Sequence, residues 1–331
     1  MNIQLEDLTF YYDKKKVLHD INLQIPEGRL TLVCGVTGSS KSTLLRIIAG
    51  LDKPASGSIS YSKHEAESAV SMVFQMPETQ LFASSAYKDI EYGLEQREVP
   101  KFHRTELVHQ ALDTVGLPHE QFSERSPFLL SGGEKRKLCI AGAIAATPEL
   151  LILDEPTAGL DPQAVRSLLE TVQELRTSGL TIVIGTHDLD SFFPIADEVV
   201  VMSRGYVHDQ GPVATLIAQP DRLSTAGLEA PAYVRMGRKL HVLGRLPLIP
   251  DSPEGLLQLL STQSYLIPAG NALQAESKGS GELLNFAVSE DSNEREEENP
   301  SSSPVSARKA RWQGLDPRVK WLGMVLWTLV I

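Results

Sequence analysis

A glycine-rich turn between an apolar run and a helical run constrains the fold of this chain more than any other stretch. Residues 30–34, LTLVC, are typical of a buried strand, and residues 34–45, CGVTGSSKSTLL, lead from it into a helix that ends at Gly50. Gly35 and Gly38 let the backbone curl so that successive N–H groups face inward and hold an anion. The positive end of the following helix adds to this, so the turn is a candidate phosphate-binding loop.

One position of the turn departs from the phosphate-binding pattern G-x-x-x-x-G-K-[ST]. Ser40 stands where the pattern has glycine, whereas Gly35, Lys41 and Ser42 match it. In such a loop the lysine reaches the β- and γ-phosphates, and the hydroxyl after it binds Mg²⁺. On its own, the turn is equally consistent with a Gly/Ser turn that begins a helix.

Strand-like and helix-like segments alternate from residue 2 to about residue 222. Short alternating runs in residues 2–34, then SGSISY and AVSMVF, indicate strands, and residues 84–148 are helical with breaks at prolines. The runs LLILDE, LTIVIGT and EVVVMSRGYV follow, with helices between them. This order predicts an α/β domain with a largely parallel sheet and an inserted helical subdomain.

Composition excludes some partners. With 31 Lys and Arg against 42 Asp and Glu, the net charge of −11 argues against a nucleic-acid backbone as the main partner. The sequence begins without a signal-peptide pattern, and it contains no run of 18 apolar residues that would span a bilayer. Cys34 and Cys139 have no metal-ligand spacing and are predicted to be small buried residues.

The chain changes character after about residue 225. Residues 226–270 keep a modest apolar pattern that predicts a small C-terminal domain, and residues 271–311 are rich in Ser, Glu and Asn. Because this second stretch can bury almost nothing, we expect a disordered linker there. The sequence then closes on an apolar run, WLGMVLWTLVI.

Two further segments carry candidate chemistry. The apolar run LLILDEP, residues 150–156, delivers Asp154 and Glu155 at the carboxyl end of a buried strand, where α/β sheets bind ligands. Asp154 is a candidate Mg²⁺ ligand and Glu155 a candidate to polarise an attacking water, although solvated acids at a strand end are the alternative. In LSGGEKRKL, residues 130–138, the S-x-x-E pattern predicts a capped helix start, and its glycine pair permits close approach of an anion.

A phosphate-binding loop, then LSGGE, then an apolar run with DE, in this order, resembles the ATPase subunit of an ATP-binding cassette transporter. The resemblance implies a P-loop NTPase cassette over residues 1–225, with a RecA-like parallel-sheet core and an N-terminal antiparallel β part. It also implies an inserted helical subdomain at about residues 76–149. Two such cassettes would close head to tail around ATP, so the implied partner is a second ATPase, identical or different.

The resemblance also implies the site residues for ATP and Mg²⁺. The aromatic that stacks on adenine is matched by Tyr12, with Tyr11 as a close rival, and AGLD at 158–161 matches the loop after the catalytic glutamate. The implied catalytic residues are Glu155, His187 and Gln75, and the implied Mg²⁺ ligands are Ser42, Gln75 and Asp154. The implied nucleotide-binding residues are Tyr12, Gly35, Gly38, Ser39, Ser40, Lys41, Ser42, Thr43, Ser131, Gly132 and Gly133.

Two details resemble the energy-coupling factor importers, which take up vitamins or cobalt and nickel ions. The first is P-x-x-Q-L-F after Gln75. The second is the end of the chain, residues 312–331, which is similar to the start of the transmembrane coupling subunit of these importers. We therefore expect a fusion at the cytoplasmic face of the membrane, in which the linker 271–311 spans roughly 35 Å as a coil. An amphipathic tail that packs on the protein or lies on lipid is the alternative.

Ser40 leaves two functions open. If the backbone there needs a positive φ, serine costs about 1–2 kcal/mol, and we expect weakened ATP binding with hydrolysis retained. The chain is then an import ATPase; the alternative is a hydrolysis-impaired partner whose LSGGE completes a sister subunit's site. A soluble cassette ATPase of DNA repair or translation fits less well, because the chain has neither a long coiled-coil insertion nor a duplicated cassette.

Overall fold

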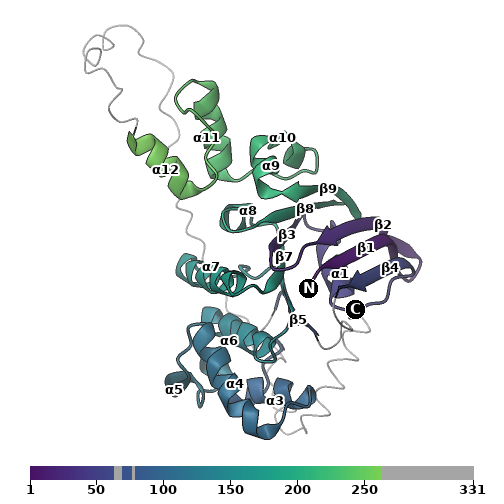
Figure 1. Ribbon diagram of the computed structural model, residues 1–331, viewed down its shortest axis with the longest axis vertical. Coiled ribbons are helices and arrows are strands. Elements are labelled where there is room, and N and C mark those ends of the chain that lie inside the picture. Colours follow the sequence, from purple (N-terminus) through teal and green to yellow (C-terminus); the bar gives the residue numbers. More distant parts are fainter. Residues whose placement is uncertain (63–68, 77–78, 263–331) are drawn as a thin grey trace, which may run out of the picture. The chain divides into compact units, whose positions relative to one another are not determined.

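The computed structural model describes residues 1–62, 69–76 and 79–262 (Figure 1). The predicted linker at 271–311 and the predicted start of a membrane component at 312–331 lie outside these residues, as does the end of the predicted small domain. Within the described ranges, no helix is both long and apolar enough to cross a bilayer.

The predicted parallel sheet is confirmed. It has six strands in the order β5-β6-β7-β3-β8-β9, and all neighbours are parallel except β8 and β9. Strands β3, β6 and β7 are fully buried along their whole length, which is why their sequences are continuous apolar runs. The strand bounds are β3 Leu30–Cys34, β5 Val70–Val73, β6 Leu150–Asp154, β7 Thr181–Thr186, β8 Glu198–Ser203 and β9 Tyr206–Pro212.

One predicted strand is two strands. The run EVVVMSRGYV bends back at Arg204 and Gly205, whose φ values are 51° and 82°, and forms the antiparallel hairpin of β8 and β9. Two consecutive residues with positive φ are the geometry of a tight hairpin turn. A Cβ on Gly205 would lie 2.1 Å from the carbonyl oxygen of Val17, so only glycine fits there.

The predicted N-terminal antiparallel part is also confirmed. It is a three-stranded sheet in the order β2-β1-β4, with β1 Ile3–Tyr12, β2 Lys15–Ile25 and β4 Ser56–Tyr61. Helix α1, Lys41–Ile48, joins this sheet to the parallel one, because its buried apolar side chains belong to the same core cluster as residues of both sheets. From the antiparallel sheet this cluster takes Ile3 and Leu5, and from the parallel sheet Val33 and Val183.

Alternate residues of the parallel strands face a second core on the other side. Leu32 and Ile184 pack there in one cluster with Leu168 and Val172 of α7, Pro162–Thr177. Helix α8, Leu189–Phe192, lies on the same side with the fully buried Phe192. The parallel sheet is therefore covered on both faces, as its all-apolar strands require.

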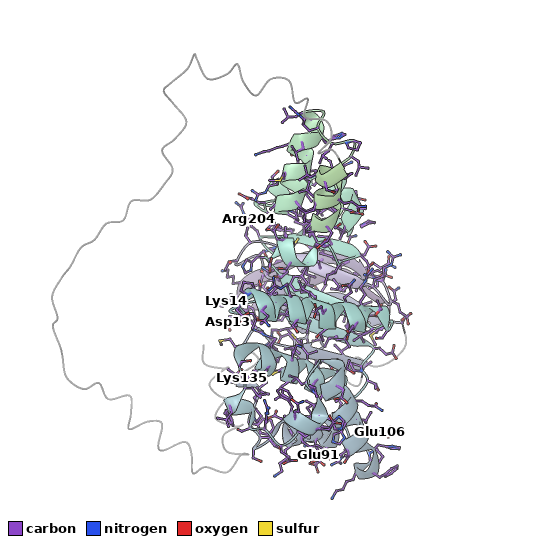
Figure 2. The ribbon with its side chains drawn as sticks, turned by 90° about the vertical axis from the view of Figure 1, so that its left-hand side faces the viewer. Asp13, Lys14, Glu91, Glu106, Lys135 and Arg204 are labelled. Carbon is purple, nitrogen blue, oxygen red and sulfur yellow. The ribbon has the colours of Figure 1, made fainter. Side chains whose placement is uncertain are left out.

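The segment between β5 and β6 is helical. Its elements are α3 Ala86–Gln96, α4 Lys101–Thr114, α5 His119–Phe122, the 3₁₀ turn η2 Pro127–Leu129 and α6 Gly132–Ile144. The three prolines at which breaks were predicted precede α4, precede α5 and begin η2. Helix α6 contacts α3, α4, α7 and β5, so it connects this helical segment to the parallel sheet. Figure 2 labels Glu91 and Glu106 on the surface of the segment.

In the described part of the chain, four helices follow β9: α9 Val213–Ala218, α10 Asp221–Ser224, α11 Ala232–Val242 and α12 Pro253–Thr262. The N–H of Ala232 donates to the Asp190 carboxylate, 2.6 Å away, and Tyr233 is buried in the same core as α7 and α8. The start of α11 is therefore fixed on the α/β core.

Candidate functional site

Three strands of the parallel sheet end at the same edge. Cys34 of β3 pairs with Thr186 of β7, and Asp154 of β6 pairs with Gly185. The chain continues from these ends into the segment 35–43, here called the glycine-rich loop, and into Glu155 and His187. Because the carboxyl ends of parallel strands meet, segments that are far apart in the sequence converge on one site.

The glycine-rich loop is tightly folded at its first glycine. A Cβ on Gly35 would lie 2.4 Å from the carbonyl oxygen of Met202 and 2.4 Å from Ser39 Oγ, so no other residue fits. Gly38 has a φ of 81° and is exposed. Ser39 is buried, and its N–H donates to the carbonyl of Val36 over 3.0 Å.

Ser40 adopts the conformation that makes serine unfavourable. Its φ is 77° and its ψ is 25°, in the left-handed region, and its side chain makes no capping hydrogen bond to α1. The condition on which the Ser40 prediction depended is therefore met. A residue with a Cβ loses about 1–2 kcal/mol in this region relative to glycine.

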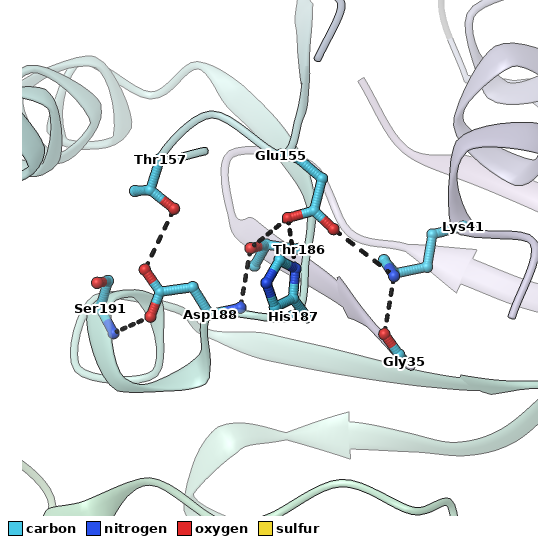
Figure 3. A network of polar contacts seen from close by, with 8 residues as sticks. All are labelled: Gly35, Lys41, Glu155, Thr157, Thr186, His187, Asp188 and Ser191. Atoms are coloured by element: carbon cyan, nitrogen blue, oxygen red, sulfur yellow. Dashed lines mark hydrogen bonds and ion pairs between the residues drawn. The ribbon is translucent and has the colours of Figure 1, made fainter. Parts of the chain in front are cut away.

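Lys41 is buried and points back into the loop. Its Nζ donates to the carbonyl oxygen of Gly35 over 2.7 Å and lies 3.7 Å from Glu155 Oε1 (Figure 3). The ammonium group is therefore shared between a loop carbonyl and the acid that was predicted to be catalytic.

Glu155 is fixed by two further groups. Thr186 Oγ1 donates to Glu155 Oε2 over 3.0 Å, and His187 Nδ1 lies 2.9 Å from the same oxygen (Figure 3). Glu155 has a φ of 46°, which is a strained conformation for a residue with a side chain. Strain combined with three polar partners is the pattern expected of a preorganised functional group.

A second layer of hydrogen bonds positions this cluster. The N–H of Asp188 donates to Thr186 Oγ1 over 3.0 Å, and Thr157 Oγ1 donates to Asp188 Oδ2 over 3.2 Å. Asp188 also caps α8 by accepting from the N–H of Ser191 (Figure 3). The segments after β6 and after β7 are thereby held together.

Asp154 has the features of a metal ligand. It is buried, and its Oδ1 has no hydrogen-bond partner among the described residues. Burial raises the pKa of Asp154 above its usual value, against a hydrogen bond with Ser42 that lowers it. A desolvated carboxylate oxygen beside a serine hydroxyl is an oxygen-donor set of the kind that Mg²⁺ prefers, so these residues fit the ion.

Tyr12 and Gln75 lie at exposed positions. Tyr12 ends β1 with 47% of its surface exposed, and its ring packs edge-on against Phe10 with centroids 5.0 Å apart. Tyr11 is 43% exposed, so exposure does not discriminate between the two tyrosines. Gln75 follows β5 and is exposed, and its carbonyl oxygen accepts from Arg136 over 3.1 Å.

The LSGGE segment, residues 130–134, has the predicted capping box. Ser131 Oγ accepts from the N–H of Glu134, and Glu134 Oε2 accepts from the N–H of Ser131 over 2.7 Å. A Cβ on Gly132 would meet open space, whereas one on Gly133 would lie 2.9 Å from Ala164 Cβ. Gly132 therefore leaves the start of α6 open to solvent, and Gly133 permits close packing on α7.

The structure brings some of the predicted residues together and leaves others apart. Gly35, Lys41, Ser42, Asp154, Glu155 and His187 form one connected cluster. Among the described residues, no hydrogen bond or ion pair joins Ser131, Gly132 or Gly133 to that cluster. Thr43 lies in α1 and is buried.

Two residues that contact the predicted site segments were not predicted themselves. Thr186 directly precedes His187, and its position as the last residue of a buried strand is the signal that could have identified it. Arg136 lies in the basic run KRK of residues 135–137, which is typical of an exposed helix face, although it is 2% exposed.

The chain is similar to known proteins. The family described as ABC transporter matches residues 18–158. The energy-coupling factor transporter ATP-binding protein EcfA2 of Clostridium tetani is 37% identical over 260 residues, which cover 74% of this chain and 90% of that protein. EcfA2 of Clostridium perfringens is 34% identical over 281 residues, which cover 78% of this chain and 99% of that protein.

Solved structures are similar as well. The structure of CbiO1 from Clostridium perfringens, described as part of the ABC transporter complex CbiONQ, has a TM-score of 0.62 at 31% identity and covers 73% of this chain and 98% of its own. A dimeric ATP-binding cassette in a post-hydrolysis state, bound to ADP and Pi, has a TM-score of 0.57 at 26% identity. It covers 64% of this chain and 98% of its own.

Proposed function

The chain belongs to the ATP-binding proteins of the energy-coupling factor transporters, ABC ATPases that couple ATP hydrolysis to transport, and we propose that it drives the uptake of a vitamin or a metal ion. The observation that supports an active role most directly is the cluster of Lys41, Glu155, Thr186 and His187 at one sheet edge. A chain that only completed a partner's site would not need these contacts.

The contacts of Lys41 and Glu155 support a division of labour on ATP. Lys41 is held by the Gly35 carbonyl and by Glu155, and it turns to the β- and γ-phosphates when they enter the loop. This frees Glu155 Oε1, while Thr186 and His187 keep Oε2 in place. Glu155 then accepts the proton of the water that attacks the γ-phosphorus, as the bond to the ADP oxygen breaks.

The remaining predicted residues complete the site. Ser42, Asp154 and Gln75 would hold Mg²⁺, which would neutralise charge on the phosphate oxygens. His187 has 65% of its side chain exposed, which leaves its ring accessible to a γ-phosphate beside Glu155. Tyr12 stacks on adenine. The loop amides of residues 35–43 and the start of α1 bind the phosphates.

The exposed start of α6 supports a dimer. Ser131, Gly132 and Gly133 bind the nucleotide of a second cassette ATPase, identical or different, whose own LSGGE segment closes over the loop of this chain. In this proposal the chain has a cassette domain at 1–225 and a small domain at 226–270. The cassette domain contains a helical subdomain at about 76–149.

The membrane partners are a transmembrane coupling subunit and a substrate-binding membrane protein. We place the ATPase at the cytoplasmic face of the membrane. Residues 312–331 begin the coupling subunit as a fusion, with 271–311 as its linker. The match to the Clostridium perfringens EcfA2 uses 78% of this chain and 99% of that protein, so this chain contains residues that the match does not cover. Membrane fractionation of the natural polypeptide without any other transporter subunit tests the fusion.

Ser40 supports the second candidate, a hydrolysis-impaired partner. Its φ of 77° makes the loop costlier to form than with glycine, and its Cβ stands where the pattern has none. The two candidates differ in one measurement. Phosphate release by the purified full chain with Mg-ATP supports the import ATPase, whereas release only after a second cassette ATPase is added supports the partner role. No binding of Mg-ATP in either case would overturn both.

A further inference from the structure

Arg136 is a buried arginine on the helix that begins with the LSGGE segment. It is 2% exposed, and it lies three and four residues after Gly133 and Gly132 in α6. Residues at these spacings share one face of a helix, so the side chain of Arg136 lies beneath the glycine pair. Burial of a guanidinium is costly, and an arginine stays at such a position only where its hydrogen bonds are used.

The hydrogen bonds of Arg136 reach two other segments of the site. Its Nη1 donates to the carbonyl oxygen of Gln75 over 3.1 Å, and its Nη2 donates to the carbonyl oxygen of Ala158 over 3.0 Å. Gln75 is a proposed Mg²⁺ ligand, and Ala158 begins the AGLD segment, residues 158–161, three residues after Glu155. A planar guanidinium fixes both carbonyls relative to one rigid group.

A second contact holds α6 against the AGLD segment. Gly133 packs so closely on Ala164, in the first turn of α7, that an added Cβ would be 2.9 Å from Ala164 Cβ. Asp161 caps the same turn by accepting from the N–H groups of Gln163 and Ala164. A shift of the start of α6 therefore moves the AGLD segment with it.

We propose that Arg136 is a positioning residue that transmits the state of the LSGGE segment to Gln75 and to the AGLD segment of the same chain. When a partner's nucleotide fixes Ser131–Gly133, Arg136 moves with α6. Its hydrogen bonds then fix the main-chain carbonyls of Gln75 and Ala158. The proposal rests on the roles proposed for Gln75 and for the LSGGE segment.

Arg136→Met tests it, because methionine keeps much of the side-chain volume and removes both donors. We expect the kcat of ATP hydrolysis by the full chain, with its dimer partner where one is required, to fall about tenfold to a hundredfold, since displacement by an ångström costs about that much. The KM for ATP stays within about twofold, because no atom of Arg136 belongs to the nucleotide site. Arg136→Lys, which serves one carbonyl, restores part of the rate.

Arg104→Met is the matched control. In the same helical segment, Arg104 Nε donates to the carbonyl of Val99 over 2.8 Å and Arg104 Nη1 pairs with Glu95 over 3.6 Å, and neither partner is a predicted site residue. We expect its kcat to stay within about twofold of the parent. Equal losses of kcat in Arg104→Met and Arg136→Met, with equal losses of thermal stability, would overturn the proposal in favour of a purely structural role.

The pair Gln75→Ala and Arg136→Met decides whether Arg136 acts through Gln75. If it does, Arg136→Met lowers kcat much less in the Gln75→Ala background than in the parent. Multiplicative losses, or an active parent on which Gln75→Ala has no effect, would refute this inference and leave the ATPase function intact. A parent that hydrolyses no ATP with any partner would instead refute the proposed function. If Arg136→Met does not fold, Arg136→Lys carries the same comparison.

Discussion

The two helix starts that were predicted to meet phosphate are built in opposite ways. The N-cap residue of helix α1 is Ser40, which has a left-handed backbone and makes no side-chain cap. The N-cap residue of helix α6 is Ser131, which forms a complete capping box with Glu134. At the N-terminus of α1, no N-cap side chain accepts from the free backbone N–H groups. At the N-terminus of α6, the capping box satisfies N–H groups from within the chain.

The acids beside these two helix starts differ in the same sense. Burial raises the pKa of Asp154 beside α1, whereas the N–H of Ser131 lowers the pKa of Glu134 in α6. One carboxylate is destabilised until a cation arrives, and the other is stabilised without any ligand. The difference indicates that the α1 region needs a bound ligand to balance its groups. The α6 region is already balanced by its own hydrogen bonds and is exposed to a partner.

Lys41→Met gives the largest expected effect, because it removes the charge of the α1 region and keeps most of the side chain. Loss of a charge-assisted hydrogen bond of about 1.5–3 kcal/mol weakens ATP binding about tenfold to a hundredfold. Hydrolysis falls further, since the positive charge that stabilises the transferring phosphoryl group is lost as well. Titration with a fluorescent ATP analogue measures affinity, and phosphate release measures turnover. An unchanged affinity would show that the loop does not hold the phosphates.

Gly132→Asp separates the two regions. The added carboxylate enters open space at the start of α6, so the fold tolerates it, but it repels the phosphates of a partner's nucleotide. We expect hydrolysis to fall about tenfold to a hundredfold, while this chain's own ATP affinity changes less than about twofold. Gly132→Ala is the control, with the same backbone and no charge. A parallel loss of affinity would mean that α6 serves the chain's own site.

Ser40→Gly relaxes the strain of the α1 region. Relief of about 1–2 kcal/mol at a φ of 77° predicts ATP binding that is up to about tenfold tighter, to the extent that nucleotide binding orders this loop. Isothermal titration of both proteins with ATP and Mg²⁺ measures the difference. Equal affinities would show that Ser40 costs nothing in binding, and the hydrolysis-impaired alternative would lose its support.

The local elements of both regions were predictable from the sequence. The apolar run 150–154 gave a buried strand, S-x-x-E gave the capping box at Ser131, and Asp161 caps α7. Each depends on residues that are neighbours in the chain. The hairpin at Arg204 and Gly205 was missed, because a single apolar run hides a turn made by two positive φ values.

The contacts between segments were not predictable in the same way. The bonds of Glu155 to Thr186 and of Arg136 to Gln75 join residues 31 and 61 positions apart, and they exist only because of the sheet register and the packing of α6. Arg136 is buried between two less buried lysines of its own helix, and its hydrogen bonds go to Gln75 and Ala158 of other segments. Tertiary packing overrides the local pattern at such positions.

The smallest effects are opposite in sign for the two acids. The raised pKa of Asp154 means that stability falls as pH rises from the ordinary value through the folded value, and Asp154→Asn removes this loss. At neutral pH we therefore expect nucleotide-free Asp154→Asn to unfold a few degrees above the parent, and to gain nothing from Mg-ATP.

The lowered pKa of Glu134 means that its contribution to stability is present above its ordinary pKa and is lost as pH falls. Glu134→Gln therefore melts slightly below the parent at neutral pH, and the difference vanishes in acid. Calorimetry of the three proteins from acidic to neutral pH measures both shifts. A change of the melting temperature in the same direction for both variants would contradict the opposite contributions of the two acids.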